Sequence, residues 1–194
     1  MKKILVFLMF VSLSVFGQSN SVGIQMFHSS DAPSGLLNHS ILSVGGGLSF
    51  QHTYESGLFL KSGLKLVSVD YTFHLYTYKH MNSYRIPMNI GKRFGNDFAF
   101  AELSIGPQIS YYSNYIDYVF EEGVLQMSNN ERERRSFCVG FNYNINIGTP
   151  LNDYYELAIG LHGSSDIVNI KALSNNTRNM INSKAIYFEI SRKF

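Results

Sequence analysis

His162 and Ser164 stand two residues apart late in the chain, and the carboxylates of Glu156 and Glu189 lie before and after them. Histidine, serine and a carboxylate are the residue types of a hydrolase, in which the histidine takes the proton of a serine nucleophile. Alternation along a β-strand also places residues two apart on one face, whatever their role. The pair alone therefore predicts no catalytic site, and we expect no enzyme activity.

Metal and disulfide chemistry has little support in the sequence. A single cysteine, Cys138, excludes an intramolecular disulfide and every multi-cysteine zinc motif. We expect Cys138 to be a small interior side chain. The other histidines, at positions 28, 39, 52, 74 and 80, lack the spacing of metal ligands. We therefore expect neither a metal nor a cofactor.

Charged residues recur on the polar face of alternating segments: Lys61, Lys65, Arg85, Arg93, Glu102, Glu156, Glu189 and Lys193. Five positive and three negative groups facing one narrow interior are expected to pair, because an unpaired buried charge is costly. The Gly95-Asn96-Asp97 turn would place Asn89 roughly opposite Glu102, with Arg85 and Arg93 one pair away on either side. The set could be the selectivity lining of a pore. We favour a structural network of salt bridges, because eight strands leave only side-chain room inside.

The segments that must position these charges alternate with period two, which is typical of β-strands. Near the C-terminus, Ile186, Phe188 and Ile190 face one way, while Tyr187 and Glu189 face the other. Eight such segments can be drawn, at about residues 20–28, 41–53, 57–72, 83–94, 98–112, 134–148, 154–165 and 184–194.

The connections between these segments alternate in length. Short turns lie at 54–56, 95–97 and 149–153, and longer connections at 29–40, 73–82, 113–133 and 166–183. An even number of strands with tight turns at one end and long loops at the other is typical of bacterial outer-membrane barrels. The sequence predicts an all-β fold, an eight-stranded antiparallel up-and-down transmembrane β-barrel, with both chain ends on the periplasmic side.

The first seventeen residues have the layout of a secretory signal peptide. Lys2 and Lys3 precede an apolar run from residue 4 to 16, and Val15 and Gly17 supply the small residues of a cleavage site. Cleavage would leave residues 18–194 as one barrel domain. It would also leave fourteen of the 16 basic residues against 14 acidic ones, a balance that argues against nucleic-acid binding.

Only 15% of the 194 residues are charged, whereas soluble domains carry about a quarter. The polar faces are mostly small or amide residues, which suit a narrow lumen. Few charges fall on the apolar faces, as lipid contact requires. We therefore expect an outer-membrane location. The alternative is a soluble periplasmic, lipocalin-like barrel, apolar inside, that binds an apolar ligand.

Aromatic residues cluster where two predicted strands leave the membrane: Tyr111, Tyr112, Tyr115 and Tyr118, and Tyr71, Phe73, Tyr76 and Tyr78. At this level they predict an interfacial girdle, in which Tyr and Phe serve where Trp is absent. The alternative interpretation is a binding surface for sugar or peptide.

Three stretches resemble the PorT-like outer-membrane β-barrel family of Gram-negative bacteria. Residues 83–95 are similar to the family's Tyr-x-x-Pro strand, and residues 101–112 contain its Gly106-Pro107 pair. Residues 139–170 resemble a family strand and the end that follows it. Tyr187, Phe188 and Phe194 are together similar to the C-terminal aromatic signal that the barrel-assembly machinery reads in this class.

The resemblance implies a fold more than a function. We expect a small barrel with a filled lumen that is structural or adhesive, or accessory to an envelope or secretion complex. Its expected partners are outer-membrane lipid, the assembly machinery and envelope proteins that contact residues 113–133 and 166–183. A lipid-modifying enzyme is a further alternative, because His-x-Ser on a late strand is similar to the His/Ser/Glu set of lipid A deacylases.

Overall fold

The computed structural model describes residues 19–33, 41–74, 77–113, 116–121, 124–128, 136–169 and 181–194. They form antiparallel strands β1 (Ser19–Pro33), β2 (Ile41–Thr53), β3 (Leu58–His74), β4 (Thr77–Gly95), β5 (Phe100–Tyr112), β6 (Ile116–Glu121), β7 (Val124–Ser128), β8 (Ser136–Pro150), β9 (Tyr155–Asn169) and β10 (Ile181–Lys193). No helix in these ranges is long and apolar enough to cross a membrane. The predicted signal peptide lies outside the described residues.

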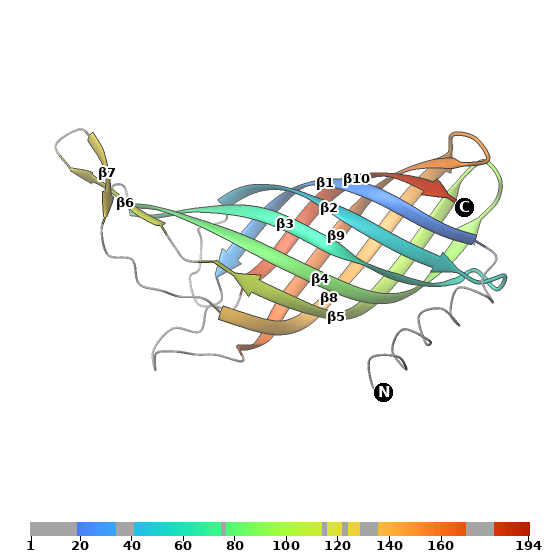
Figure 1. Ribbon diagram of the computed structural model, residues 1–194, viewed down its shortest axis with the longest axis horizontal. Helices are drawn as coiled ribbons and strands as arrows, with labels where there is room; N and C mark the ends of the chain where they lie inside the picture. Colours follow the sequence, from blue (N-terminus) through green and yellow to red (C-terminus); the bar gives the residue numbers. More distant parts are fainter. Residues whose placement is uncertain are drawn as a thin grey trace, which may run out of the picture.

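Eight of these strands close into a barrel. Each pairs with its neighbours in the order β3, β2, β1, β10, β9, β8, β5, β4, and pairing of β3 with β4 closes the ring. Strands β6 and β7 form a hairpin beyond one end of the barrel, and β6 pairs there with the start of β4 (Figure 1). The start of β1, the C-terminus and the tight turns lie at the opposite end (Figure 1). The predicted eight-stranded antiparallel barrel is confirmed.

Several strands extend further toward the long-loop end than the sequence predicts. β1 continues to Pro33 and β9 to Asn169, and β3 and β4 remain paired as far as His74 and Thr77. Within the predicted 113–133 loop, residues 116–121 and 124–128 form the β6–β7 hairpin instead. Backbone pairing continues at these positions because the ladder depends on backbone groups, whereas the prediction followed side-chain alternation.

The observed register between β4 and β5 differs from the predicted one. Arg93, not Asn89, lies opposite Glu102. Gly95 takes a φ of 142°, and Asn96 Oδ1 accepts hydrogen bonds from the backbone N–H groups of Phe98 and Ala99. The turn therefore spans residues 96–99 and is centred further along the chain than the predicted Gly95-Asn96-Asp97. Arg93 is thereby brought directly opposite Glu102 instead of diagonal to it.

The two faces of the wall have opposite polarity. The exposed large apolar side chains on outward-facing strand positions range from 38% at Ile109 to 70% at Met26. Inward-facing positions are mainly polar and buried, including Gln25, Ser49, Gln108 and Asn142. A lipocalin-like soluble barrel would have the reverse arrangement, with apolar side chains inside. The outer face forms an apolar belt of the kind that contacts lipid.

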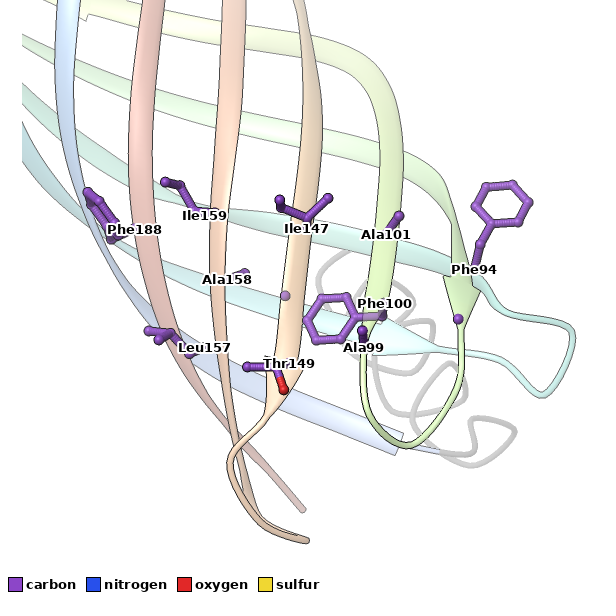
Figure 2. Close-up of a pocket in the computed structure, with 12 residues that line it drawn as sticks. Phe94, Ala99, Phe100, Ala101, Ile147, Thr149, Leu157, Ala158, Ile159 and Phe188 are labelled. Carbon is purple, nitrogen blue, oxygen red and sulfur yellow. The ribbon is translucent and has the colours of Figure 1, made fainter.

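Figure 2 shows an open hollow in this belt near the 96–99 and 151–154 turns, with a volume of about 710 Å³. Outward-facing side chains such as Phe94, Ile147 and Phe188 line it, and Thr149 is the one polar side chain among its described lining residues. The Thr149 hydroxyl donates to the carbonyl of Phe98 at 2.8 Å, and the other lining side chains are apolar, so lipid acyl chains can fill the hollow.

Aromatic rings line one side of the outer face at the long-loop end. Tyr84 lies 5.9 Å from Tyr111, and Tyr111 lies 4.7 Å from Phe137, measured between ring centroids. Tyr112 does not belong to this group: only 2% of it is exposed and it faces the lumen, because it is one residue out of phase with Tyr111. The other predicted girdle residues have side chains outside the described set.

Candidate functional site

The lumen is the candidate site, because it collects the polar side chains of all eight wall strands. All eight charged residues singled out from the sequence occupy inward positions. Lys61 and Lys65 come from β3, Arg85 and Arg93 from β4, and Glu102 from β5. The remaining three are Glu156 on β9 and Glu189 and Lys193 on β10. Period-two alternation points them inward, since each shares the phase of the buried residues on its strand.

Glu189 is the centre of one group of contacts. Its Oε2 accepts hydrogen bonds from Lys61 Nζ at 2.7 Å and Gln25 Nε2 at 2.9 Å, and its Oε1 accepts one from Ser49 Oγ at 2.6 Å. These groups come from β10, β3, β1 and β2, so one carboxylate joins four strands. These three donors, of which the Lys61 ammonium also forms an ion pair, compensate the removal of the Glu189 carboxylate from water.

Arg93 is the centre of a second group nearer the tight turns. Its guanidinium lies 2.5 Å from Glu156 and 3.6 Å from Glu102, and Lys193 Nζ is also 2.5 Å from Glu156. Gln51 donates to Glu102 at 2.9 Å. Because β2 and β5 are not neighbours, this bond crosses the lumen, as does the Arg93–Glu156 ion pair between β4 and β9.

Asp166 provides a fourth inward carboxylate that the sequence prediction missed. Its side chain is 4% exposed, and its oxygens accept hydrogen bonds from Ser110 Oγ at 3.2 Å and from Tyr112 Oη. The residue was assigned to the 166–183 loop, although it shares the phase of Glu156 and Ser164 along β9. A β-bulge follows at Ile167, since Val139 pairs with Val168 and Gly140 with Asp166.

Lys65 and His162 meet in the middle of the lumen. Lys65 Nζ lies 3.3 Å from His162 Nδ1, which is also 2.8 Å from Asn144 Oδ1. A small cavity of about 10 Å³ adjoins them, and Arg85 and Ser183 also line it. In the described part of the chain, His162 Nε2 and Ser183 Oγ have no hydrogen-bond partner.

The hydrolase hypothesis finds no matching geometry. His162 and Ser164 both face the lumen, but no hydrogen bond joins them, and His162 contacts no carboxylate among the described residues. Glu189 is engaged by Lys61, and Glu156 by Arg93 and Lys193. The described ranges contain no group of three or more His, Cys, Asp or Glu that could hold a metal.

Amides and phenols link the charged groups, and sequence reasoning gave them no individual role. Asn146 donates to Glu102 at 3.1 Å and accepts a hydrogen bond from Tyr187 Oη. Asn144 Nδ2 lies within hydrogen-bond distance of Ser104 Oγ and Asn142 Oδ1, at 3.2 and 3.3 Å. The alternation of asparagines at 142, 144 and 146 is the sequence signal that marks them as one inward row.

Of the C-terminal aromatics, Phe188 and Phe194 lie on the outer face, whereas Tyr187 is buried and faces the lumen. Phe188 is 57% exposed and Phe194 is 70% exposed. The backbone N–H of Phe194 donates to the carbonyl of Asn20 at 2.8 Å, which joins the two ends of the described chain. The guanidinium of Arg192 lies 5.4 Å from the centroid of the Phe194 ring.

No family model matches the chain, and no curated protein matches it either. Solved structures share its fold. Neisserial surface protein A superposes with a TM-score of 0.63 at 13% identity, covering 90% of this chain and 97% of that one. The attachment invasion locus protein Ail of Yersinia pestis gives a TM-score of 0.54 at 8% identity, covering 92% and 99%. Ail in complex with the heparin analogue sucrose octasulfate gives 0.55 at 7% identity, covering 91% and 98%.

These likenesses give the chain the fold of the small outer-membrane β-barrels of bacteria. The outer-membrane location predicted from the sequence agrees with this fold and with the apolar belt around it.

Proposed function

We propose that this protein is an integral outer-membrane barrel, its lumen filled by its own side chains, with a structural or adhesive role. The observation that carries the proposal is the polarity of the wall, apolar outside and hydrogen-bonded inside. An eight-stranded barrel has interior space only for side chains or one small ligand. The cross-lumen Arg93–Glu156 and Gln51–Glu102 contacts support a filled interior.

The adhesive or accessory role would belong to the long-loop end. The β6–β7 hairpin extends β4 there, beyond the closed barrel (Figure 1). Ail, which has this fold, is described as an attachment invasion locus protein and binds a heparin analogue. By analogy, residues 113–133 and 166–183 would contact an envelope or surface partner, or a component of a secretion complex.

Export and assembly would follow the usual route for this class. Residues 1–17 would direct secretion, and Phe188 and Phe194 would form the signal that the barrel-assembly machinery reads. The Tyr-x-x-Pro and Gly-Pro motifs support a finer relationship to the PorT-like family. The eight inward charges would stabilise the wall strands and would not conduct ions.

The proposed role is non-enzymatic. The lumen surrounds His162 and Ser164 with buried polar neighbours and offers them no hydrogen-bonded carboxylate among the described residues. His162→Ala and Ser164→Ala are each expected to leave the membrane lipid composition of the producing strain unchanged. A change in acylated lipid in both variants would instead support the lipid-modifying enzyme.

Heat-modifiable gel migration of detergent-extracted protein tests the central proposal. An intact barrel resists SDS until it is heated, so unheated and boiled samples should migrate at different positions. Cell fractionation gives the second readout, and the protein is expected in the outer-membrane fraction. A protein that stays soluble without detergent and migrates identically in both samples would contradict the proposal.

A further inference from the structure

Charged side chains are rare on the described outer face of the barrel wall. Among the strand residues whose side chains the structure describes, Lys92, Lys184 and Arg192 are the charged ones that point outward. Lys92 lies beside the 54–57 turn and donates to the carbonyl of Ser56, and Arg192 lies near the C-terminus beside the Phe194 ring. Lys184 lies far from these tight turns, and no described residue pairs with its ammonium group.

Polar residues surround Lys184 on the same outer face. Asn182 pairs in register with Ser165 across β10 and β9. His28 pairs with Ile186 on the other side, which places it diagonal to Lys184. All four side chains are exposed. We name this group, Lys184, His28, Asn182 and Ser165, the Lys184 patch.

An aromatic ring covers the wall beside Lys184 on the β9 side. The direct partner of Lys184 on β9 is Gly163, which has no side chain to cover the lysine. The ring of Tyr143 lies against Gly163 from the next strand, where a Cβ would meet it. Gly163 is therefore buried under this ring, and the side of Lys184 that faces β9 is bordered by Tyr143, which is 47% exposed.

Apolar side chains lie on both sides of the Lys184 patch along the strands. Met26, Ile186 and Leu161 lie toward the tight turns and are 70%, 52% and 54% exposed. Ile167, which is 50% exposed, follows Ser165 toward the long-loop end. The Lys184 patch is thus a group of polar side chains with apolar, lipid-facing side chains on both sides of it along the strands. A lysine on the lipid face destabilises a barrel strongly at the middle of a bilayer and little near its interface.

We propose that the Lys184 patch binds the phosphate of an anionic lipid in the outer leaflet. An ammonium, an imidazole, an amide and a hydroxyl offer donors to phosphate oxygens, and the charge complements the lipid. The acyl chains of that lipid would lie against Met26, Ile186 and Leu161. The inference rests on the proposed function, because the tight turns must face the periplasm for Lys184 to reach the outer leaflet.

Native mass spectrometry of the detergent-purified full barrel tests the inference, with bisphosphorylated lipid A as the probe and dephosphorylated lipid A as its matched comparison. The wild-type barrel should retain the phosphorylated lipid and not the dephosphorylated one. Lys184→Gln should lower the retained fraction about tenfold, as expected when one charge-assisted hydrogen bond is lost. Lys184→Arg should retain the lipid, and Arg192→Gln, which removes an outward charge near the C-terminus, should leave retention unchanged.

Three outcomes would overturn the inference: equal retention by wild type and Lys184→Gln, equal retention of both lipids, or an equal loss in Arg192→Gln. Each sample is also run as heated and unheated gel lanes. A wild-type barrel without a heat shift contradicts the proposed function itself, whereas a shifted barrel with unchanged retention contradicts the lipid site alone. If Lys184→Gln does not fold, His28→Gln replaces it, with a smaller loss of phosphorylated lipid expected and equal retention overturning the inference.

Discussion

At the scale of single residues, Glu189 is expected to be a principal source of stability. It pairs with Lys61 at 2.7 Å, and their side chains are only 6% and 9% exposed. Glu189→Gln should leave a buried ammonium without its counter-charge and lower the free energy of unfolding by about 3 kcal/mol. Urea titration of the barrel in lipid vesicles, followed by circular dichroism, would measure this change.

The control for this prediction is Glu55→Gln, in the exposed turn between β2 and β3, which should change stability little. The double variant Lys61→Met/Glu189→Leu should recover part of the loss, because it removes both charges together. An unfolding free energy of Glu189→Gln equal to that of wild type would contradict the assigned ion pair.

The small cavity beside His162 gives a second prediction at this scale. Its volume of about 10 Å³ is close to the minimum that holds one water, and His162 Nε2 and Ser183 Oγ on its wall have no described partner. A crystal structure that resolves solvent should show one ordered water within hydrogen-bond distance of both atoms. An empty cavity would contradict this prediction, and Ser183→Ala is the variant expected to weaken the density.

At the scale of elements, the β6–β7 hairpin is expected to be separable from the barrel. Among the residues that the structure describes, it pairs with β4 through positions 77–80 of that strand. Replacing residues 116–128 with a short Gly-Ser linker should therefore keep the heat shift of the barrel. It should also abolish capture of any partner that binds the hairpin, measured by cross-linking on intact cells. Loss of the heat shift would show that the hairpin is needed for barrel formation.

The positions of the eight wall strands could be predicted because one physical rule governs each of them. A strand between lipid and a polar lumen must alternate, so Ile186, Phe188 and Ile190 separate from Tyr187 and Glu189 on sequence alone. The same rule placed all eight predicted charges on inward positions. It gave no information about strand length beyond the membrane, where neither face has to be apolar.

Contacts across the lumen could not be predicted, because they depend on register. A turn centred further along the chain was enough to place Arg93, instead of Asn89, opposite Glu102. Asp166 is absent from the predicted charge network because strand β9 continues to Asn169, into the predicted 166–183 loop. Tyr112 was assigned to the girdle because its neighbours are aromatic, although a shift of one residue turns it into the lumen.

At the scale of the whole molecule, the barrel explains the unusual composition. A lipid-facing surface needs no charges, and only 15% of the chain is charged. Most of the charged side chains that the structure describes lie in the lumen or in the tight turns. The described inward charges comprise Lys61, Lys65, Arg85, Arg93 and Lys193 against Glu102, Glu156, Asp166 and Glu189. Nearly equal numbers of opposite charges in one narrow space favour pairing over a field that would select ions.

The last prediction follows from this arrangement and concerns conductance. Arg93 forms an ion pair with Glu156 across the lumen, and Gln51 donates a hydrogen bond to Glu102 across it. The guanidinium carbon Cζ of Arg93 lies 3.6 Å from the centroid of the Phe100 ring. The wild-type barrel should therefore give no steady current in a planar lipid bilayer. The triple variant Gln51→Ala/Arg93→Ala/Glu102→Ala should give frequent current steps, because it removes the side chains that cross the tight-turn end of the lumen. Lys92→Ala, which changes the outward-facing neighbour of Arg93, should remain silent, and a large steady current through the wild type would show an open pore.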